Sequence, residues 1–215
     1  MACTDRTHAA LAILLAITSG ACEAPSATTQ NVAGAEPIAA TAAPAKPPLV
    51  PPEFAIPTLV EGPGFKLVPL GPDLVDIDYR AYMSSISHLQ KTFSRSTSWP
   101  TQGITHNDAM LDMQSEQARF LKRESFAYAV LTPDGTCERG SLYVSPSPVA
   151  PYDAMVRMWV TQAEYDAGFD AELYRWATGW IAREWPFEAV AYPGRAVDWA
   201  VWDAMVAEEK TAAAP

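Results

Sequence analysis

The spacing of apolar residues predicts a succession of strands and helices from about residue 65 to residue 209. Five stretches are mainly apolar or alternate between apolar and polar positions, which favours strands: 65–70, 126–131, 140–144, 154–160 and 188–192. In three stretches apolar positions recur every three or four residues, which favours amphipathic helices: 76–89, 105–121 and 170–184. A short terminal helix is expected over 196–209.

Local signals mark several boundaries of these elements. Thr105 and Asp108 have the spacing of a capping box at a helix start, and Pro186 stops the helix before it. The order is strand, two helices, three strands, helix, strand, which predicts an α+β layer because strands and helices are segregated along the chain. The final strand–helix–strand step implies one parallel pair with a right-handed crossover.

The N-terminus has the pattern of an export signal. Residues 9–17 form an apolar run of nine residues, which is shorter than the roughly 20 needed to span a bilayer and typical of a signal peptide. Ser19, Gly20 and Ala21 then precede Cys22, which resembles a bacterial lipobox, although Ser19 stands where leucine is usual. We expect a signal peptide over 1–21, with two open alternatives: lipidation of Cys22 or ordinary cleavage.

Residues 22–57 are rich in Ala, Pro, Thr and Ser. Such a segment buries too little apolar surface to offset its ordering entropy, so we expect a disordered linker that proline biases towards extended conformations. The prediction is therefore an exported protein of the cell envelope, with a folded domain over 58–210. It would be anchored to the membrane by a lipid on Cys22 or released into the periplasm.

The charge of the chain and its histidine and cysteine residues limit the classes of ligand and partner that we expect. The formal net charge is -10, which argues against non-specific binding of nucleic acid or anionic lipid, because phosphates need Lys and Arg. An acidic chain is compatible with a small amine or an envelope protein as partner. Alternatively, the negative charge only keeps the domain soluble. We expect no metal site, since His88 and His106 share no ligand spacing with each other or with Cys137. Hydrolase and nucleotide-phosphate motifs are absent from the sequence.

The element order and several motifs between about residues 65 and 195 resemble a divergent bacterial branch of the GNAT-type N-acetyltransferases. The motifs are Trp99-Pro100, Asn107, Phe126-x-Tyr128, Gly140-x-x-Tyr143-x-x-Pro146, Arg157-x-Trp159-Val160, Trp185-Pro186-Phe187 and Tyr192. The resemblance implies a three-layer α/β fold, with helices on both faces of a GNAT-like mixed sheet. Such a sheet would hold acetyl-CoA between two splayed parallel strands, here 154–160 and 188–192. It also implies site residues: Met158, Trp159, Val160, Gln162 and Gly168 for the cofactor, Tyr192 as catalytic acid, and Asn107, Arg157 and Arg195 for the substrate.

The expected cofactor loop departs from the GNAT pattern. Over residues 161–170 it keeps one glycine, Gly168, and carries the acids Glu164, Asp166 and Asp170. Because Asp166 or Asp170 can cap the following helix, we expect the chain's own carboxylates to consume the N–H donors that a diphosphate needs. Two functions therefore stay open. One is acyl transfer from acetyl-CoA to an amine; the other is a non-enzymatic lipoprotein binding module, a pseudoenzyme of the envelope, where acetyl-CoA is not expected.

Overall fold

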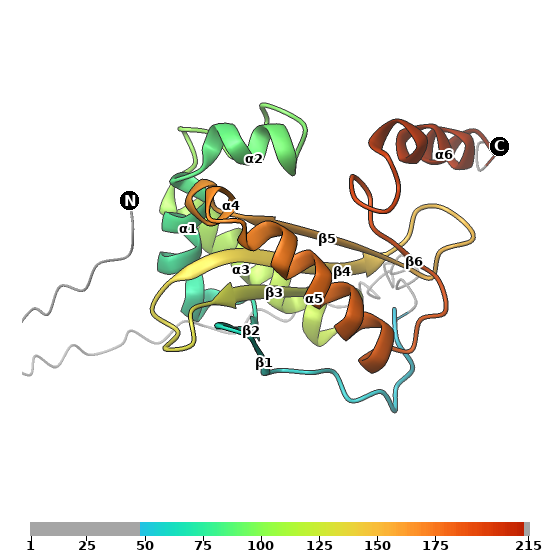
Figure 1. Ribbon diagram of the computed structural model, residues 1–215, viewed down its shortest axis with the longest axis horizontal. Coiled ribbons are helices and arrows are strands. Elements are labelled where there is room, and N and C mark those ends of the chain that lie inside the picture. Colours follow the sequence, from blue (N-terminus) through green and yellow to red (C-terminus); the bar gives the residue numbers. More distant parts are fainter. Residues whose placement is uncertain (1–47, 213–215) are drawn as a thin grey trace, which may run out of the picture. The chain divides into compact units, whose positions relative to one another are not determined.

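The computed structural model describes residues 48–212, and within them six strands form one sheet in sequence order (Figure 1). The strands are β1 (Val60–Gly62), β2 (Phe65–Pro69), β3 (Phe126–Leu131), β4 (Glu138–Pro146), β5 (Ala154–Val160) and β6 (Val190–Ala191). Successive strands pair antiparallel up to β5, and β5 pairs with β6 in parallel. The parallel pair at the end of the sheet confirms the predicted crossover.

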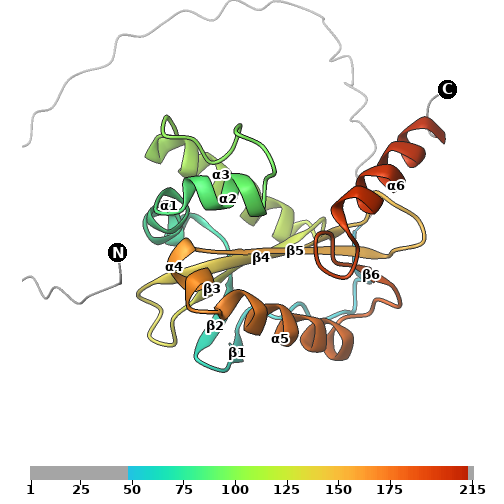
Figure 2. The same ribbon diagram turned by 45° about the horizontal axis from the view of Figure 1, so that its top comes forward.

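Helices cover both faces of the sheet, which confirms the predicted three layers (Figure 2). One face carries α1 (Val75–Met83), which follows a 3-10 turn over Pro72–Leu74, with α2 (Ile86–Thr92) and α3 (His106–Leu121). The other face carries α5 (Phe169–Glu184) after the short α4 (Gln162–Asp166), and α6 (Trp199–Ala212) ends the described chain. The described residues form three apolar cores: Leu173 and Trp180 of α5 belong to one, Leu89 and Met113 of α2 and α3 to a second, and Trp202 of α6 to a smaller third.

The helix predicted over 76–89 is two helices, and the break lies at two serines. Ser84 Oγ donates to the carbonyl of Ala81 at 2.6 Å, so this side chain competes with the helical pattern for a backbone acceptor. Ser85 is buried, and its Oγ accepts the backbone N–H of Gln162 at 2.9 Å. The break therefore fastens α2 to the segment that leads into α5.

The folded part begins earlier than the expected domain start at residue 58. Val50 is only 2% exposed and belongs to the core beside α5, and Leu49 donates its N–H to the carbonyl of Arg123. Tyr128 OH binds the carbonyl of Pro57 at 2.9 Å. The average composition of the predicted linker did not reveal the apolar residues in 48–57 that pack against the domain. We call residues 48–57 the N-terminal strap. The signal peptide, Cys22 and the linker up to residue 47 lie outside the described residues.

Two carboxyl groups are buried between α1 and β4. Asp78 is 3% exposed and Glu138 is 7% exposed. Ser141 Oγ donates to Glu138 Oε1 at 2.7 Å, while Glu138 Oε2 has no hydrogen-bond partner in the described part of the chain. Burial raises the pKa of Asp78 to about 7, with a further contribution from the charge of Asp112 in α3. Burial also raises the pKa of Glu138, so protonation of this pair favours the folded state.

Candidate functional site

The parallel strands β5 and β6 diverge almost as soon as they pair. Their register consists of Ala154 opposite Val190 and Met155 opposite Ala191. Beyond Met155, β5 continues to Val160 and stays bonded to β4 along its other edge. The chain after Ala191 instead turns through Tyr192, whose carbonyl accepts the N–H groups of Arg195 and Val197. The β5 edge from Val156 onward therefore lies open.

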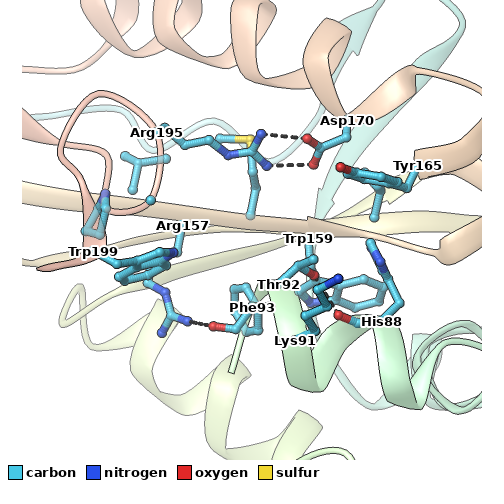
Figure 3. Close-up of a pocket in the computed structure, with 15 residues that line it drawn as sticks. His88, Lys91, Thr92, Phe93, Arg157, Trp159, Tyr165, Asp170, Arg195 and Trp199 are labelled. Carbon is cyan, nitrogen blue, oxygen red and sulfur yellow. Dashed lines mark hydrogen bonds and ion pairs between the residues drawn. The ribbon is translucent and has the colours of Figure 1, made fainter. Parts of the chain in front are cut away.

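A cavity of about 250 Å³ occupies this divergence (Figure 3). Its walls come from α2 and the residue after it, from β5, from Tyr165 and the first turn of α5, and from the turn between β6 and α6. The lining residues are His88, Lys91, Thr92, Phe93, 156–160, Tyr165, Asp170, 193–195 and Trp199. Segments that are far apart in the sequence thus meet around the open edge of β5.

The cavity is cationic although the chain as a whole is acidic. Among its lining residues Lys91, Arg157 and Arg195 are cations, and Asp170 is the acid. Burial lowers the pKa of His88 below its ordinary value of 6.5, so this imidazole is neutral at pH 7. A local excess of positive charge between apolar walls attracts an anionic ligand.

The acids of the expected cofactor loop bind other side chains instead of capping α5, so the capping prediction is wrong. Asp170 forms a two-pronged ion pair with Arg195, with N–O distances of 2.5 and 2.6 Å, and Figure 3 shows both contacts. Asp166 accepts a hydrogen bond from the side-chain amide of Gln162, and Glu164 pairs with Arg139. A two-pronged contact with a guanidinium is stronger than a cap, which explains the outcome for Asp170.

The start of α5 consequently keeps N–H groups for a ligand. Gly168 is its N-cap in a left-handed conformation with φ of 85°, and it has no side chain to cap the helix. A Cβ added at Gly168 would meet nothing within 4 Å. Before the helix, the N–H groups of Gln162 and Glu164 are already bound to Ser85 and Thr161. The donors that remain belong to the first turn of α5, where no helical carbonyl is in reach and the helix dipole favours an anion.

The structure brings only part of the expected site together. Met158, Trp159, Val160, Arg157 and Arg195 line the cavity, whereas Gln162 and Gly168 lie in the loop beside it.

Tyr192 and Asn107 do not line the cavity. Tyr192 is 8% exposed and packs edge-on against Tyr174 of α5, with ring centroids 5.7 Å apart. Burial raises its pKa to about 12. Asn107 is exposed on the first turn of α3. The structure therefore brings neither side chain to the cavity lining, and their expected roles stay predictions.

Several cavity residues were not predicted from the sequence, and Trp199 is the clearest. It packs at the turn after β6, where a Cβ added to Gly194 would lie 2.3 Å from Trp199 Nε1. Arg95 lies over the same indole, 4.4 Å from its centroid, and pairs with Asp203 of α6 at 2.7 Å. The Pro193-Gly194 turn in the sequence could have indicated that a side chain packs closely against the backbone here. The loop after α2 and the start of α6 together form one wall of the cavity.

Neither a cluster of metal ligands nor a membrane-spanning helix occurs among the described residues. Within 48–212 no cluster of three or more His, Cys, Asp or Glu side chains has the arrangement of metal ligands. In the same range no helix combines the length and apolar character required to cross a bilayer.

Comparison with known proteins supports the fold. No protein-family model matches the sequence, and no curated protein matches it significantly. Among solved structures, the ribosomal-protein-S5-alanine acetyltransferase from Vibrio fischeri is similar at 11% identity with a TM-score of 0.51, covering 70% of this chain and 82% of that one. The ribosomal L7/L12 alpha-N-protein acetyltransferase RimL is 14% identical with a TM-score of 0.45, covering 58% and 65% of the two chains. The first likeness, together with the sheet order, shows that the domain has the GNAT acetyltransferase fold.

Proposed function

We propose that the domain binds an acyl-CoA in the cavity beside β5 and transfers the acyl group to an amine. A fold alone does not fix a function. The observation that carries the proposal is the divergence of β5 from β6 after Met155, which opens a cationic cavity next to an uncapped helix N-terminus. The arrangement offers an extended anionic ligand a strand edge along its length and N–H donors at one end.

The cavity residues fit such a cofactor. The open edge of β5 at Met158 suits the pantetheine arm, because an extended chain can bond to a free strand edge. The first turn of α5 suits the diphosphate, and Lys91 adds positive charge to the cavity lining. The volume of about 250 Å³ lies near the lower end of ligand cavities, so it suits the arm, with the nucleotide outside. Bound acetyl-CoA would supply an activated thioester.

We infer that His88 acts as a general base in this cavity. It lines the cavity, and its ring lies 4.9 Å from that of Tyr165. Burial lowers its pKa, and the backbone of Val160 opposes this shift by hydrogen bonding. A neutral imidazole can accept a proton from the ammonium group of an acceptor. Activity should therefore fall as the pH drops below the lowered pKa of His88, and His88→Gln should flatten that limb of the pH profile.

Isothermal titration of the full-length protein with acetyl-CoA tests the proposal directly. The wild type should release or absorb heat with saturation, and the exposed cavity substitution Lys91→Glu should weaken binding by about tenfold, which corresponds to about 1.4 kcal/mol. The matched control is Lys122→Glu, because Lys122 is exposed at the end of α3 and does not line the cavity. Absence of heat at millimolar acetyl-CoA would end the acyltransferase proposal.

A second candidate is a non-enzymatic binding module of the cell envelope, which the leader pattern at residues 9–22 favours. An exported domain would not meet acetyl-CoA, so the two candidates make opposite predictions. Metabolic palmitate labelling that is present in the wild type and lost in Cys22→Ala, combined with no acetyl-CoA binding, would support the module. Recovery of the protein in the cytosol with Met1 retained would contradict it.

A further inference from the structure

Arg157 is a half-buried cation at the cavity that has no acidic partner. It is the second residue of β5 beyond the last position paired with β6. Four other arginines form ion pairs with Asp or Glu, namely Arg95, Arg119, Arg139 and Arg195. Within residues 48–212 Arg157 forms no ion pair, and its guanidinium donates to the carbonyl of Phe93. A guanidinium that is partly removed from water without a counter-ion gains strongly from an incoming anion.

Two aromatic rings lie close to this guanidinium. Its carbon lies 4.2 Å from the ring centroid of Phe93 and 5.8 Å from that of Trp199, and Figure 3 shows the side chain directed towards Phe93 on the α2 side of β5. A guanidinium has five N–H donors, so most remain for a ligand after the bond to Phe93. Burial lowers the pKa of Arg157, which is the expected effect of partial desolvation on a cation.

We propose that Arg157 binds a carboxylate of the amine acceptor, so that the acceptor is a small, amino-acid-like amine. A planar guanidinium matches a carboxylate through two parallel hydrogen bonds. The aromatic walls formed by Phe93 and Trp199 suit an apolar side chain beside that carboxylate. This inference rests on the proposed acyltransferase function, because the acceptor is the amine of that reaction.

The position of Arg157 favours the acceptor over the cofactor's phosphates as the source of the anion. The diphosphate is proposed at the start of α5, whereas Arg157 contacts Phe93 after α2, on the opposite face of the sheet. A polyamine is disfavoured, because the one acid lining the cavity, Asp170, is already paired with Arg195.

Matched acceptors that differ only in the carboxylate provide the test. Acetyl transfer by the full-length protein is followed by CoA release with L-phenylalanine, L-phenylalaninamide and spermidine. The wild type should favour phenylalanine over its amide by at least about tenfold in kcat/KM. In Arg157→Gln the KM for phenylalanine should rise about tenfold while the amide changes little, and Arg157→Lys should restore part of the preference. The exposed Arg175→Gln serves as the matched control.

Each other outcome decides against the inference. A wild-type preference for the amide or for spermidine overturns it, and so does an equal loss for both acceptors in Arg157→Gln, which indicates a purely structural contact with Phe93. Weakened titration with acetyl-CoA in Arg157→Gln would assign the anion to the cofactor's phosphates.

A second arm separates this inference from the proposed function. If acetyl-CoA does not bind, N-acetyl-L-phenylalanine and its amide are titrated without cofactor. Binding of the carboxylate to the wild type, but not to Arg157→Gln, would support the anion site alone, and absence of binding would overturn it. Circular dichroism establishes whether the variants fold. If Arg157→Gln does not fold, Arg157→Lys takes its place in the test.

Discussion

Replacing Asp78 by asparagine should stabilise the domain at alkaline pH. Burial raises the pKa of Asp78 from its ordinary value of 3.8 to about 7, so the folded state binds this proton more tightly than the unfolded state does. The stability that this proton contributes is therefore fully present below about pH 4 and is lost as the pH rises through about 7. At about 1.36 kcal/mol for each pKa unit, a shift of about three units predicts a loss of at most about 4 kcal/mol. Because Asp78 is coupled to Glu138, the share of Asp78 lies between about 2 kcal/mol for an equal division and about 4 kcal/mol for the whole loss.

Asparagine has the size of aspartate and does not titrate, so Asp78→Asn removes the cause of this loss. The measurement is urea denaturation of the wild type and the variant at pH 4 and pH 8, with Asp73→Asn as control, because Asp73 is exposed in the turn before α1. Asp78→Asn should exceed the wild type in free energy of unfolding by about 2 to 4 kcal/mol at pH 8 and by little at pH 4. A variant that is less stable at pH 8, or that gains equally at both pH values, would refute the reasoning.

Three further predictions follow from single contacts. Gly140→Ala should lower the free energy of unfolding by about 1 to 3 kcal/mol in urea denaturation, because its Cβ would lie 2.0 Å from the carbonyl oxygen of Trp159; an unchanged midpoint would contradict this. Tyr128→Phe should cost about 1 kcal/mol by the same assay, since it removes the bond to Pro57 that holds the N-terminal strap. Asp170→Asn should tighten acetyl-CoA binding several-fold in calorimetry, because a negative charge leaves the first turn of α5; weaker binding would show that pairing with Arg195 helps to shape the site.

The sequence predicted those elements whose local signals and tertiary environment agree. The ranges of β3 and β5 match their predicted strands because both strands are mostly apolar and mostly buried. The start of α3 matches because Thr105 and Asp108 form both bonds of the capping box. The helix over 76–89 failed because its apolar spacing continues across Ser84 and Ser85, and the partner that holds Ser85, the N–H of Gln162, is distant in the sequence.

The candidate site was less accessible to sequence reasoning, because its chemistry depends on pairs that are distant along the chain. The resemblance placed β5 correctly along the cavity, and Arg157 and Arg195 with it. It could not show that Arg195 would take the carboxylate of Asp170 away from the helix start, since the two residues are 25 positions apart. Tyr192 does not line the cavity for a geometric reason, because β6 is short and the Tyr192 side chain belongs to the core.

The link between Arg95 and Asp203 has a consequence for how the protein matures. Domains form from the N-terminus as the ribosome releases the chain, and the two partners of this ion pair are 108 residues apart. Trp199 and Asp203 leave the ribosome after all six strands of the sheet have been synthesised. A polypeptide cut short before Trp199 would thus retain every strand of the sheet and lack one wall of its cavity, so ligand binding is the property that premature termination would remove first.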